Sequence, residues 1–246
     1  MVCSHSEVGA IIQARMGSTR LPGKIMLEIE DRPMIGHVVE RAKRIPNVDC
    51  VIVATSTSTR EKPLVQYLRS QDIPVFRGSE RDVLGRYVRA AEKFDIDTVV
   101  RLTADNPLLM PGISAQVVHV FQEKECDYAS NTVVETYPTG LSTEVISSDA
   151  LFEVDQRTND PRDREHVTRY IRQHSDQFRL CSVTDEVNHS NIRWTVDREE
   201  DLKLVRKIYN ALYDEKPHFD YREALNCFHE HPEWATINAH IEQKKC

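Results

Sequence analysis

Short apolar runs alternate with amphipathic helical patterns through the first half of this chain, and that alternation constrains its fold more than any other feature. Strands and helices that alternate on short connections build a mostly parallel sheet with helices on both of its faces. The apolar run over residues 51–54 is continuous, as expected for a parallel strand that is buried on both sides. We therefore predict an α/β fold, with strands over 8–14, 50–55, 74–76 and 98–103, and with helices over 33–45, around 64–68, over 83–91 and over 113–121.

The pattern changes after Asp127, where the β-like runs become shorter. Residues 132–146 hold two such runs around Tyr137, which predict a hairpin or an extended arm. The whole then reads as one α/β core with an inserted, mainly β subregion near residues 130–195. Further strands are predicted over 178–183 and 192–196, and helices from Asp149, from Asp160–Pro161 over 162–170, over 202–212 and in two short polar segments before Cys246.

Composition excludes several classes of protein. With 246 residues, of which 40% are hydrophobic and 29% charged, the chain resembles a folded globular protein and not a disordered one. No apolar run approaches the roughly 20 residues of a membrane span, and residues 1–7 lack the features of a secretory signal. The six scattered cysteines form no CxxC pair, which predicts reduced thiols in a cytoplasmic protein. The formal net charge of −7 argues against a nucleic-acid partner.

The loop after the first predicted strand is the strongest candidate for a ligand site. Residues 8–27 contain no acidic residue but include Arg15, Arg20 and Lys24. Ligands of open parallel sheets bind at the carboxyl ends of the strands, and a small positive focus suits a compact polyanion such as a nucleoside triphosphate. The loop is neither a Walker loop nor a GxGxxG turn. The alternative interpretation is an ordinary surface loop with solvated cations.

Two aspartates follow other strand-like runs and are candidate ligands of Mg²⁺. Asp105 follows the run that ends at Thr103, and Asp197 follows the run over 192–196. A carboxylate beside a phosphate-binding loop is well placed to hold Mg²⁺ against substrate phosphates. The alternative is that each aspartate caps a helix that begins just after it.

The loop and several later segments resemble the cytidylyltransferase family, which includes the Kdo and acylneuraminate cytidylyltransferases. The likeness is closer to the spore-coat polysaccharide relatives of those enzymes, and it covers roughly residues 8–213. The segments that carry it are QARMGSTRLPGK (13–24), RPMI (32–35), VATS (53–56), FRGSERDVLGRY (76–87), DNPL (105–108), YPTGLSTEV (137–145), REHVT (164–168) and WTVDREEDL (194–202).

The resemblance implies a nucleotide-diphospho-sugar transferase fold, which is Rossmann-like, in a single domain over residues 1–246. Within it we expect a nucleotide-binding half (1–128), an acceptor and dimerisation subregion (129–196) and C-terminal helices (197–246). The implied activity is the Mg²⁺-dependent transfer of CMP from CTP to a sugar or other small acceptor, with release of pyrophosphate. The relatives also imply a homodimer, and the composition adds the expectation of a cytoplasmic protein without nucleic-acid or membrane partners.

The resemblance also implies roles for individual residues. Ala104 stands where these relatives commonly have glycine, and it narrows the space beside the nucleotide. The implied catalytic residues are Arg15, Lys24 and Asp105, the metal ligands are Asp105 and Asp197, and the nucleotide-binding residues are Ala14, Arg15, Arg20, Lys24, Gly78, Ser79 and Thr103.

The acceptor is expected to bind to residues between Tyr137 and Trp194. The predicted acceptor-binding residues are Gly140, Glu144, Arg164 and His166. The guanidinium of Arg164 would match a carboxylate or phosphate at two points. A surface ion pair between Glu165 and Arg169, four residues apart on one helix, explains part of the same motif.

Three other functions remain open at this level. One is a nucleotidyltransferase of the same fold that couples another nucleotide to a sugar 1-phosphate. A second is a metal-dependent glycosyltransferase. Such enzymes usually carry a DxD motif, whereas the segment after the strand over 98–103 contains a single aspartate, Asp105. The third is a nucleotide-binding scaffold protein, which the retention of Lys24, Asp105 and Asp197 disfavours.

Overall fold

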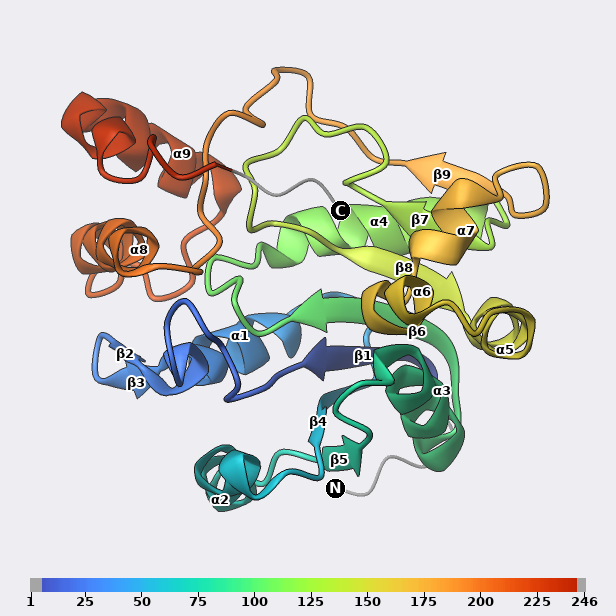
Figure 1. The fold of residues 1–246 in the computed structure, drawn as a ribbon. Helices are drawn as coiled ribbons and strands as arrows, with labels where there is room; N and C mark the ends of the chain where they lie inside the picture. The colour runs from blue at the N-terminus through green and yellow to red at the C-terminus, as the bar shows by residue number, and fades with distance from the viewer. Residues whose placement is uncertain (1–5, 243–246) are drawn as a thin grey trace.

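The structure is a computed structural model that describes residues 6–242. Its centre is a mixed, mainly parallel sheet of seven strands (Figure 1), which confirms the predicted α/β fold. In sheet order the strands are β5 (Val75–Gly78), β4 (Cys50–Ser56), β1 (Ser6–Gln13), β6 (Ile96–Thr103), β8 (Glu144–Ser147), β7 (Tyr128–Ser130) and β9 (Leu180–Ser182), while β2 (Glu28–Ile29) and β3 (Arg32–Pro33) form a separate antiparallel pair. Strand β8 runs antiparallel to both of its neighbours, and all other pairs in the large sheet are parallel.

Helices cover both faces of this sheet. The first face carries α1 (Met34–Ala42), α2 (Lys62–Ser70), α4 (Pro111–Glu123), α8 (Glu199–Leu212) and α9 (Tyr221–Glu230), and the second carries α3 (Val83–Phe94), α5 (Ser148–Arg157), α6 (Pro161–His166) and α7 (Arg169–Gln173). Figure 1 shows α8 and α9 beyond the carboxyl ends of β1 and β6. Within residues 6–242, no helix combines the length and the apolar character needed to cross a membrane.

Strand β1 separates two apolar cores because successive side chains point to opposite faces of a sheet. Val8, Ala10 and Ile12 join the core beneath α1 and α4, whereas Ile11 joins the core beneath α3 and α5. All four side chains are buried, which explains why the first strand reads as a continuous apolar run.

The strand order places a crevice at the carboxyl ends of β1 and β6. The chain passes from β1 to β4 and β5 on one side, and then crosses to β6 on the other side of β1. In open α/β sheets, ligands bind where the strand order reverses in this way. The loop that follows β1 and the residues that follow β6 therefore meet at the expected binding edge.

Two predicted β segments are wrong, the first of them in part, since 144–146 of the segment predicted over 132–146 do belong to strand β8. Residues 132–143 form turns and irregular structure between β7 and β8, and the burial of Tyr137 and Leu141 shows that the segment folds onto the body of the protein instead of extending from it. Residues 192–196 form only an isolated bridge to Thr139. The N–H groups of Trp194 and Thr195 donate to Thr139, and that of Val196 donates to Asp105. These partners do not belong to a neighbouring strand, and no local pattern reveals them.

The helix predicted over 162–170 is two short helices. Val167 has φ 54 and ψ −61, a conformation outside the helical region, so α6 ends before α7 begins. This break removes the i, i+4 geometry that Glu165 and Arg169 would have needed, and Arg169 instead pairs with Asp163 at 2.5 Å. Asp160 does cap α6, because its carboxylate accepts from the N–H of Arg162.

The expectation of reduced thiols is wrong for one pair, because Cys126 and Cys181 form a disulfide bond. Cys126 lies just before β7, and Cys181 lies in the neighbouring parallel strand β9 opposite Ala129. Their Cα atoms are 6.2 Å apart, a distance that a disulfide spans. The pair is 55 residues apart in the sequence, so spacing alone could not reveal it. Cys3 and Cys246 lie outside the described residues, as does most of the segment considered as a secretory signal.

Candidate active site

Two carboxylates converge on one buried ammonium group at the crevice between β1 and β6. The Nζ of Lys24 lies 2.9 Å from Asp105 Oδ2 and 2.9 Å from Asp197 Oδ1, and it donates a third bond to the carbonyl of Val196 at 2.8 Å. Lys24 is 8% exposed. The structure thus brings together the predicted phosphate-binding lysine and both predicted metal ligands, which are up to 173 residues apart in the sequence.

Backbone contacts explain this convergence. Asp105 lies two residues after the end of β6, and its carbonyl accepts from the N–H of Val196 at 2.8 Å, so the segment before Asp197 is fixed beside the end of β6. Gly23 has φ 68, which favours glycine, and it leads into a single 3-10 turn over Lys24–Met26. This turn directs Lys24 from the loop after β1 into the crevice.

Neither aspartate serves as the helix cap considered from the sequence. The N-terminus of α4 has no side-chain cap. At α8, the carboxylate of Asp201 accepts from the N–H groups of Asp197 and Arg198, both at 3.0 Å. The carboxylate of Asp197 instead meets Arg20 at 2.9 Å and Arg193 at 3.0 Å, in addition to Lys24.

The charges of the site stabilise one another. Burial opposes the ammonium form of Lys24, but Asp105 and Asp197 outweigh it and raise the pKa of Lys24 above its usual 10.5. Burial would likewise raise the pKa of Asp197, but Lys24, Arg20 and Arg193 hold it below its usual 3.8. Lys24 and Asp197 are therefore both charged at neutral pH.

The two aspartates fit a magnesium ion by the chemistry of their oxygens. Mg²⁺ in nucleotide enzymes commonly takes one or two carboxylates together with substrate phosphates and water. The side chain of Asp105 is 32% exposed, so it is accessible from the crevice. Across residues 6–242, no group of three or more His, Cys, Asp or Glu side chains could hold a metal alone. The remaining ligands would therefore be substrate oxygens and water.

The other predicted nucleotide-binding residues line the same edge of the sheet. Ala14 is buried and its N–H donates to the carbonyl of Ala54 in β4, while Gly78 ends β5 and Ser79 follows it. Arg15 is exposed, and its side chain has no hydrogen bond or ion pair with any described residue. Its positive charge is thus available to a ligand at the carboxyl ends of the strands.

Sequence reasoning missed a buried arginine, Arg86 of α3, beside this edge. Its Nη1 donates to the carbonyl of Ser79 at 3.0 Å, while its Nε and Nη2 have no hydrogen-bond partner among the described residues. Burial lowers the pKa of Arg86, and the nearby charge of Arg15 lowers it further. The only available signal was its place in the FRGSERDVLGRY segment.

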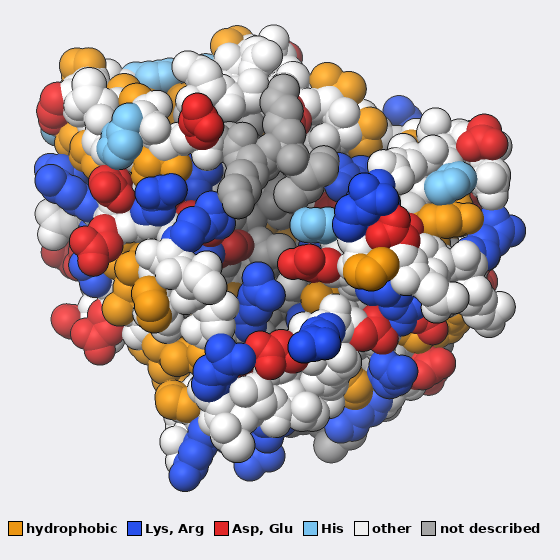
Figure 2. All heavy atoms as spheres, viewed as in Figure 1, with side chains coloured by type: hydrophobic (Ala, Val, Ile, Leu, Met, Phe, Trp, Pro, Cys, Tyr) orange, Lys and Arg blue, Asp and Glu red, His pale blue; other side chains and the backbone are white. Residues whose placement is uncertain are grey.

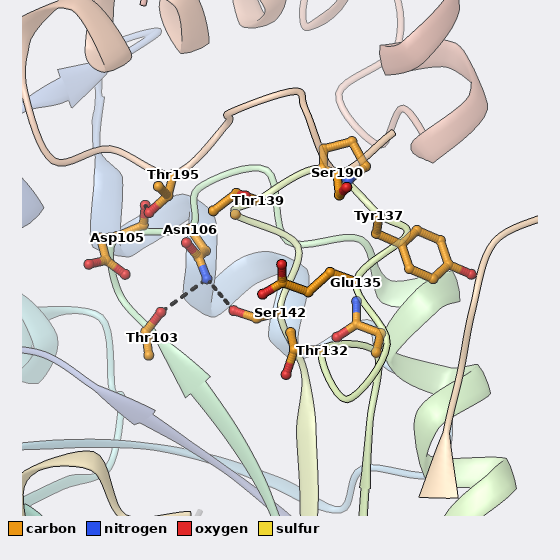
Figure 3. A pocket seen from close by; sticks show the side chains of 13 residues that line it. Thr103, Asp105, Asn106, Thr132, Glu135, Tyr137, Thr139, Ser142, Ser190 and Thr195 are labelled. Atoms are coloured by element: carbon orange, nitrogen blue, oxygen red, sulfur yellow. Dashed lines mark hydrogen bonds between the residues drawn. The ribbon is translucent and has the colours of Figure 1, made fainter. Parts of the chain in front are cut away.

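A polar cavity of about 180 Å³ adjoins Asp105, and Figure 3 shows the side chains around it. Asn106 donates to the hydroxyls of Thr103 and Ser142, and Glu135 reaches toward the same space. Gly140 has φ 109, and a Cβ there would meet the backbone N of Thr195 at 2.4 Å, so no other residue fits. Most of the lining was missed from the sequence, namely Asn106, Asn131, Thr132, Glu135, Ser142, Ser190 and Thr195.

Comparisons with known proteins identify the family. The cytidylyltransferase family profile matches residues 9–243. The chain belongs to the cytidylyltransferase family. An uncharacterized protein of Methanocaldococcus jannaschii is 32% identical over 240 residues, covering 97% of each chain. The spore coat polysaccharide biosynthesis protein SpsF of Bacillus subtilis is 30% identical over 94% of this chain and 98% of its own.

Solved structures agree with this assignment. The structure of a cytidylyltransferase from Leptospira borgpetersenii is 29% identical, has a TM-score of 0.90, and covers 98% of this chain and 100% of its own. A CMP-Kdo synthetase complexed with CTP has a TM-score of 0.66 at 20% identity, covers 84% of this chain and 99% of its own, and shows the shared fold. Among relatives matched by sequence, the 3-deoxy-manno-octulosonate cytidylyltransferase of Escherichia coli is 37% identical over 106 residues, which cover 43% of this chain and 42% of its own.

Three of the four residues predicted to bind the acceptor do not line the polar cavity of this cytidylyltransferase. Gly140 lines it, but Glu144, Arg164 and His166 do not. Arg164 instead bridges two helices, because its Nη2 lies 2.7 Å from both Asp82 and Asp155. His166 is half-buried at the end of α6.

Glu144 is a buried structural charge in β8. Its carboxylate pairs with Arg101 on the neighbouring strand β6 and accepts hydrogen bonds from Tyr128 at 2.7 Å and Thr168 at 2.6 Å. Burial would raise the pKa of Glu144, but Arg101 and these hydroxyls hold it below its usual 4.5. The acceptor roles predicted for Glu144 and Arg164 therefore find no support in the geometry.

We expect Glu144→Gln to lower the free energy of unfolding by about 3–5 kcal/mol, because it leaves the charge of Arg101 buried without its partner. Urea denaturation at pH 7 measures this, with the exposed Glu153→Gln as a control near wild type. Because the pKa of Glu144 is lowered by folding, its contribution is present above pH 4.5 and disappears as the pH falls through the folded value. An equally small effect of both variants would contradict this role.

Proposed function

We propose that this enzyme transfers CMP from CTP to an oxygen of a small acceptor, with Mg²⁺ present and pyrophosphate as the second product. The observation that carries the proposal is the ammonium of Lys24 between the carboxylates of Asp105 and Asp197, at the point where the strand order reverses. Membership of the cytidylyltransferase family supports CTP as the nucleotide.

The triphosphate would lie along the loop after β1. The exposed Arg15 and Arg20 and the buried Lys24 would neutralise it, because cations at fixed positions stabilise phosphate oxygens without a cost of reorganisation. The cytosine and ribose would then border Ala14, Gly78 and Ser79, which lie on the β4 and β5 side of the crevice.

In the proposed reaction an acceptor oxygen attacks the α-phosphorus in line, a new P–O bond forms, and the bond to pyrophosphate breaks. Bound Mg²⁺, held by Asp105 and Asp197, would supply charge neutralisation at the phosphates. Lys24 would bind the triphosphate and neutralise the negative charge that develops on the pyrophosphate leaving group. Positioning and neutralisation account for most of the catalysis in phosphoryl-group chemistry, and no covalent enzyme intermediate is needed.

The acceptor would occupy the polar cavity next to Asp105. Hydroxyl and amide groups from Thr103, Asn106 and Ser142 line it, and such groups suit a polyhydroxylated molecule. Two relatives support a sugar, since the name of SpsF refers to polysaccharide biosynthesis and the Escherichia coli relative is named for 3-deoxy-manno-octulosonate.

Asn106→Ala is expected to raise the acceptor KM about tenfold while the KM for CTP stays within twofold of wild type. The change removes the amide that orients the hydroxyls of Thr103 and Ser142. Steady-state pyrophosphate release, measured once with each substrate varied, separates the two constants. An equal rise in both would assign the cavity to the nucleotide or to the fold.

We also propose a homodimer, formed through the loops of the inserted region. Val133, Val134 and Val187 are 39%, 52% and 58% exposed, the large hydrophobic side chains most open to solvent among the described residues. The N–H of Asp185 donates to the hydroxyl of Thr136 at 2.7 Å, so the two loops that carry these valines adjoin. Light scattering should give twice the chain mass of 28.4 kDa, and Val134→Asp should shift it toward the monomer. A monomeric wild type at micromolar concentration would refute the dimer.

Pyrophosphate release from each of the four nucleoside triphosphates, with a panel of sugar acids and sugar phosphates, tests the function as a whole. CTP should be preferred, and release should require both Mg²⁺ and an acceptor. A preference for another nucleotide with a sugar 1-phosphate would favour the alternative nucleotidyltransferase, and tight CTP binding without turnover would favour the scaffold protein. A cytoplasmic location, where CTP is made, belongs to the same proposal.

A further inference from the structure

A buried carboxylate lies directly beneath the loop that carries Arg15. Glu61 is 1% exposed, and its Oε2 accepts from the backbone N–H of Met16 at 2.9 Å and from the hydroxyl of Thr55 at 3.1 Å. Its Oε1 accepts from the hydroxyl of Ser56 at 3.2 Å. A buried carboxylate is costly unless it is hydrogen-bonded, so these donors are needed to keep it in place.

Local structure directs Glu61 into this position. It ends the 3-10 turn over Thr59–Glu61, which follows β4, and the hydroxyl of Ser58 caps that turn by accepting from the N–H of Arg60. The turn leads straight into α2, so Glu61 is anchored at the junction of β4 and that helix. Its carboxylate therefore spans 45 residues of sequence to reach the loop after β1.

The peptide groups of Met16 form the central anchor of that loop. While the N–H of Met16 donates to Glu61, its carbonyl accepts from the N–H of Ser18 at 2.9 Å and from the N–H of Gly23 at 3.3 Å. Met16 directly follows Arg15, and Gly23 directly precedes Lys24. The contact with Glu61 thus ties both ends of the loop to the rigid end of β4.

We propose that Glu61 is a positioning residue that holds the phosphate-binding loop through the N–H of Met16. Glu61 fixes the backbone from which the otherwise unpartnered Arg15 is presented to the nucleotide. The expected effect of Glu61 on CTP binding rests on the proposed function, but its effect on the conformation of the loop does not. Loss of the carboxylate lets the loop leave its binding-competent conformation. This weakens CTP binding more than it lowers the turnover rate of CTP that is already bound.

The test compares Glu61→Ala, Glu61→Gln and Asp163→Ala. Glutamine keeps an acceptor oxygen for the N–H of Met16, so Glu61→Gln should restore most of what alanine loses. Asp163 is a matched control because it is also a buried carboxylate with protein donors, Thr158 and Arg169, but belongs to α6 and not to the loop. Both alanine variants are expected to lose stability, because each removes a buried, hydrogen-bonded carboxylate. A difference between them in cleavage or in CTP binding therefore reports on the loop.

Limited trypsin digestion measures how readily the loop opens, and it needs no ligand because Arg15 and Arg20 are exposed cleavage sites within the loop. Mass spectrometry of the fragments should show that cleavage after these two residues is at least tenfold faster in Glu61→Ala than in Asp163→Ala. In kinetic assays, Glu61→Ala should raise the KM for CTP about tenfold or more with a smaller change in kcat, as expected for the loss of a charge-assisted hydrogen bond.

Equal cleavage rates in the two alanine variants would overturn the proposal, and so would a KM for CTP in Glu61→Ala that matches that of Asp163→Ala. A wild-type protein that does not bind CTP would refute the proposed function instead. In that case the digestion experiment still decides whether Glu61 holds the loop.

Discussion

Lys24→Met is expected to lower kcat/KM by about a hundredfold to a thousandfold, the range seen when one preorganised donor to a developing negative charge is removed. Methionine preserves much of the side-chain length but removes the ammonium between Asp105 and Asp197. Asp105 then loses its cation, and Asp197 keeps only Arg20 and Arg193. The added negative charge further disfavours an anionic triphosphate beside them. Initial rates of pyrophosphate release over a range of CTP concentrations measure the loss in kcat/KM.

Lys43→Met is the matched control for this variant, because Lys43 is an exposed lysine just after α1 and away from the crevice. It should retain wild-type turnover, and both variants should retain the circular dichroism spectrum of the native protein. Turnover of Lys24→Met within threefold of the control would show that the ammonium has only a structural role.

Asp105→Asn and Asp197→Asn are each expected to lower kcat by at least a hundredfold with saturating CTP and Mg²⁺. Each change keeps the size of the side chain but removes one anionic oxygen ligand of the proposed magnesium site. The two variants should also need more Mg²⁺ for half-maximal activity, which a metal titration measures directly.

An exposed aspartate provides the control for these carboxylates. Asp149 lies in the first turn of α5, outside the crevice, and Asp149→Asn should leave both kcat and the Mg²⁺ requirement unchanged. If Asp105→Asn or Asp197→Asn kept the wild-type Mg²⁺ requirement, the metal assignment would be wrong even if activity fell.

The fold was predictable where strand burial leaves a local pattern. The buried strands β1, β4 and β6 read as apolar runs, and helices such as α3 and α8 have one apolar face. Both kinds of element can therefore be recognised from the sequence. The inserted region was not predictable in the same way. Its shape depends on distant contacts, such as the bonds from Trp194 and Val196 to Thr139 and Asp105, which leave no local periodicity.

The candidate site shows a similar division. Lys24, Asp105 and Asp197 were predicted because Lys24 lies in the loop after one strand-like run, each aspartate follows another, and all three carry residue types that phosphate or metal chemistry needs. The structure brings the three side chains together, and their roles stay a prediction. Glu144 and Arg164 carry equally suitable residue types, but in the structure both side chains form ion pairs within the protein, which charge alone does not reveal. The lining of the polar cavity consists largely of neutral hydroxyl and amide groups, which are too common in sequences to stand out.

Calorimetric titration of the protein with CTP in the presence of Mg²⁺ tests the central claim most directly, because it needs no knowledge of the acceptor. The account predicts one CTP per chain, weaker binding of ATP, GTP and UTP, and a loss of affinity of about tenfold or more in Lys24→Met. It also predicts weaker binding when EDTA removes the metal. Equal binding of CTP to the wild type and to Lys24→Met, with and without Mg²⁺, would contradict the assignment of the Lys24, Asp105 and Asp197 cluster as the nucleotide site.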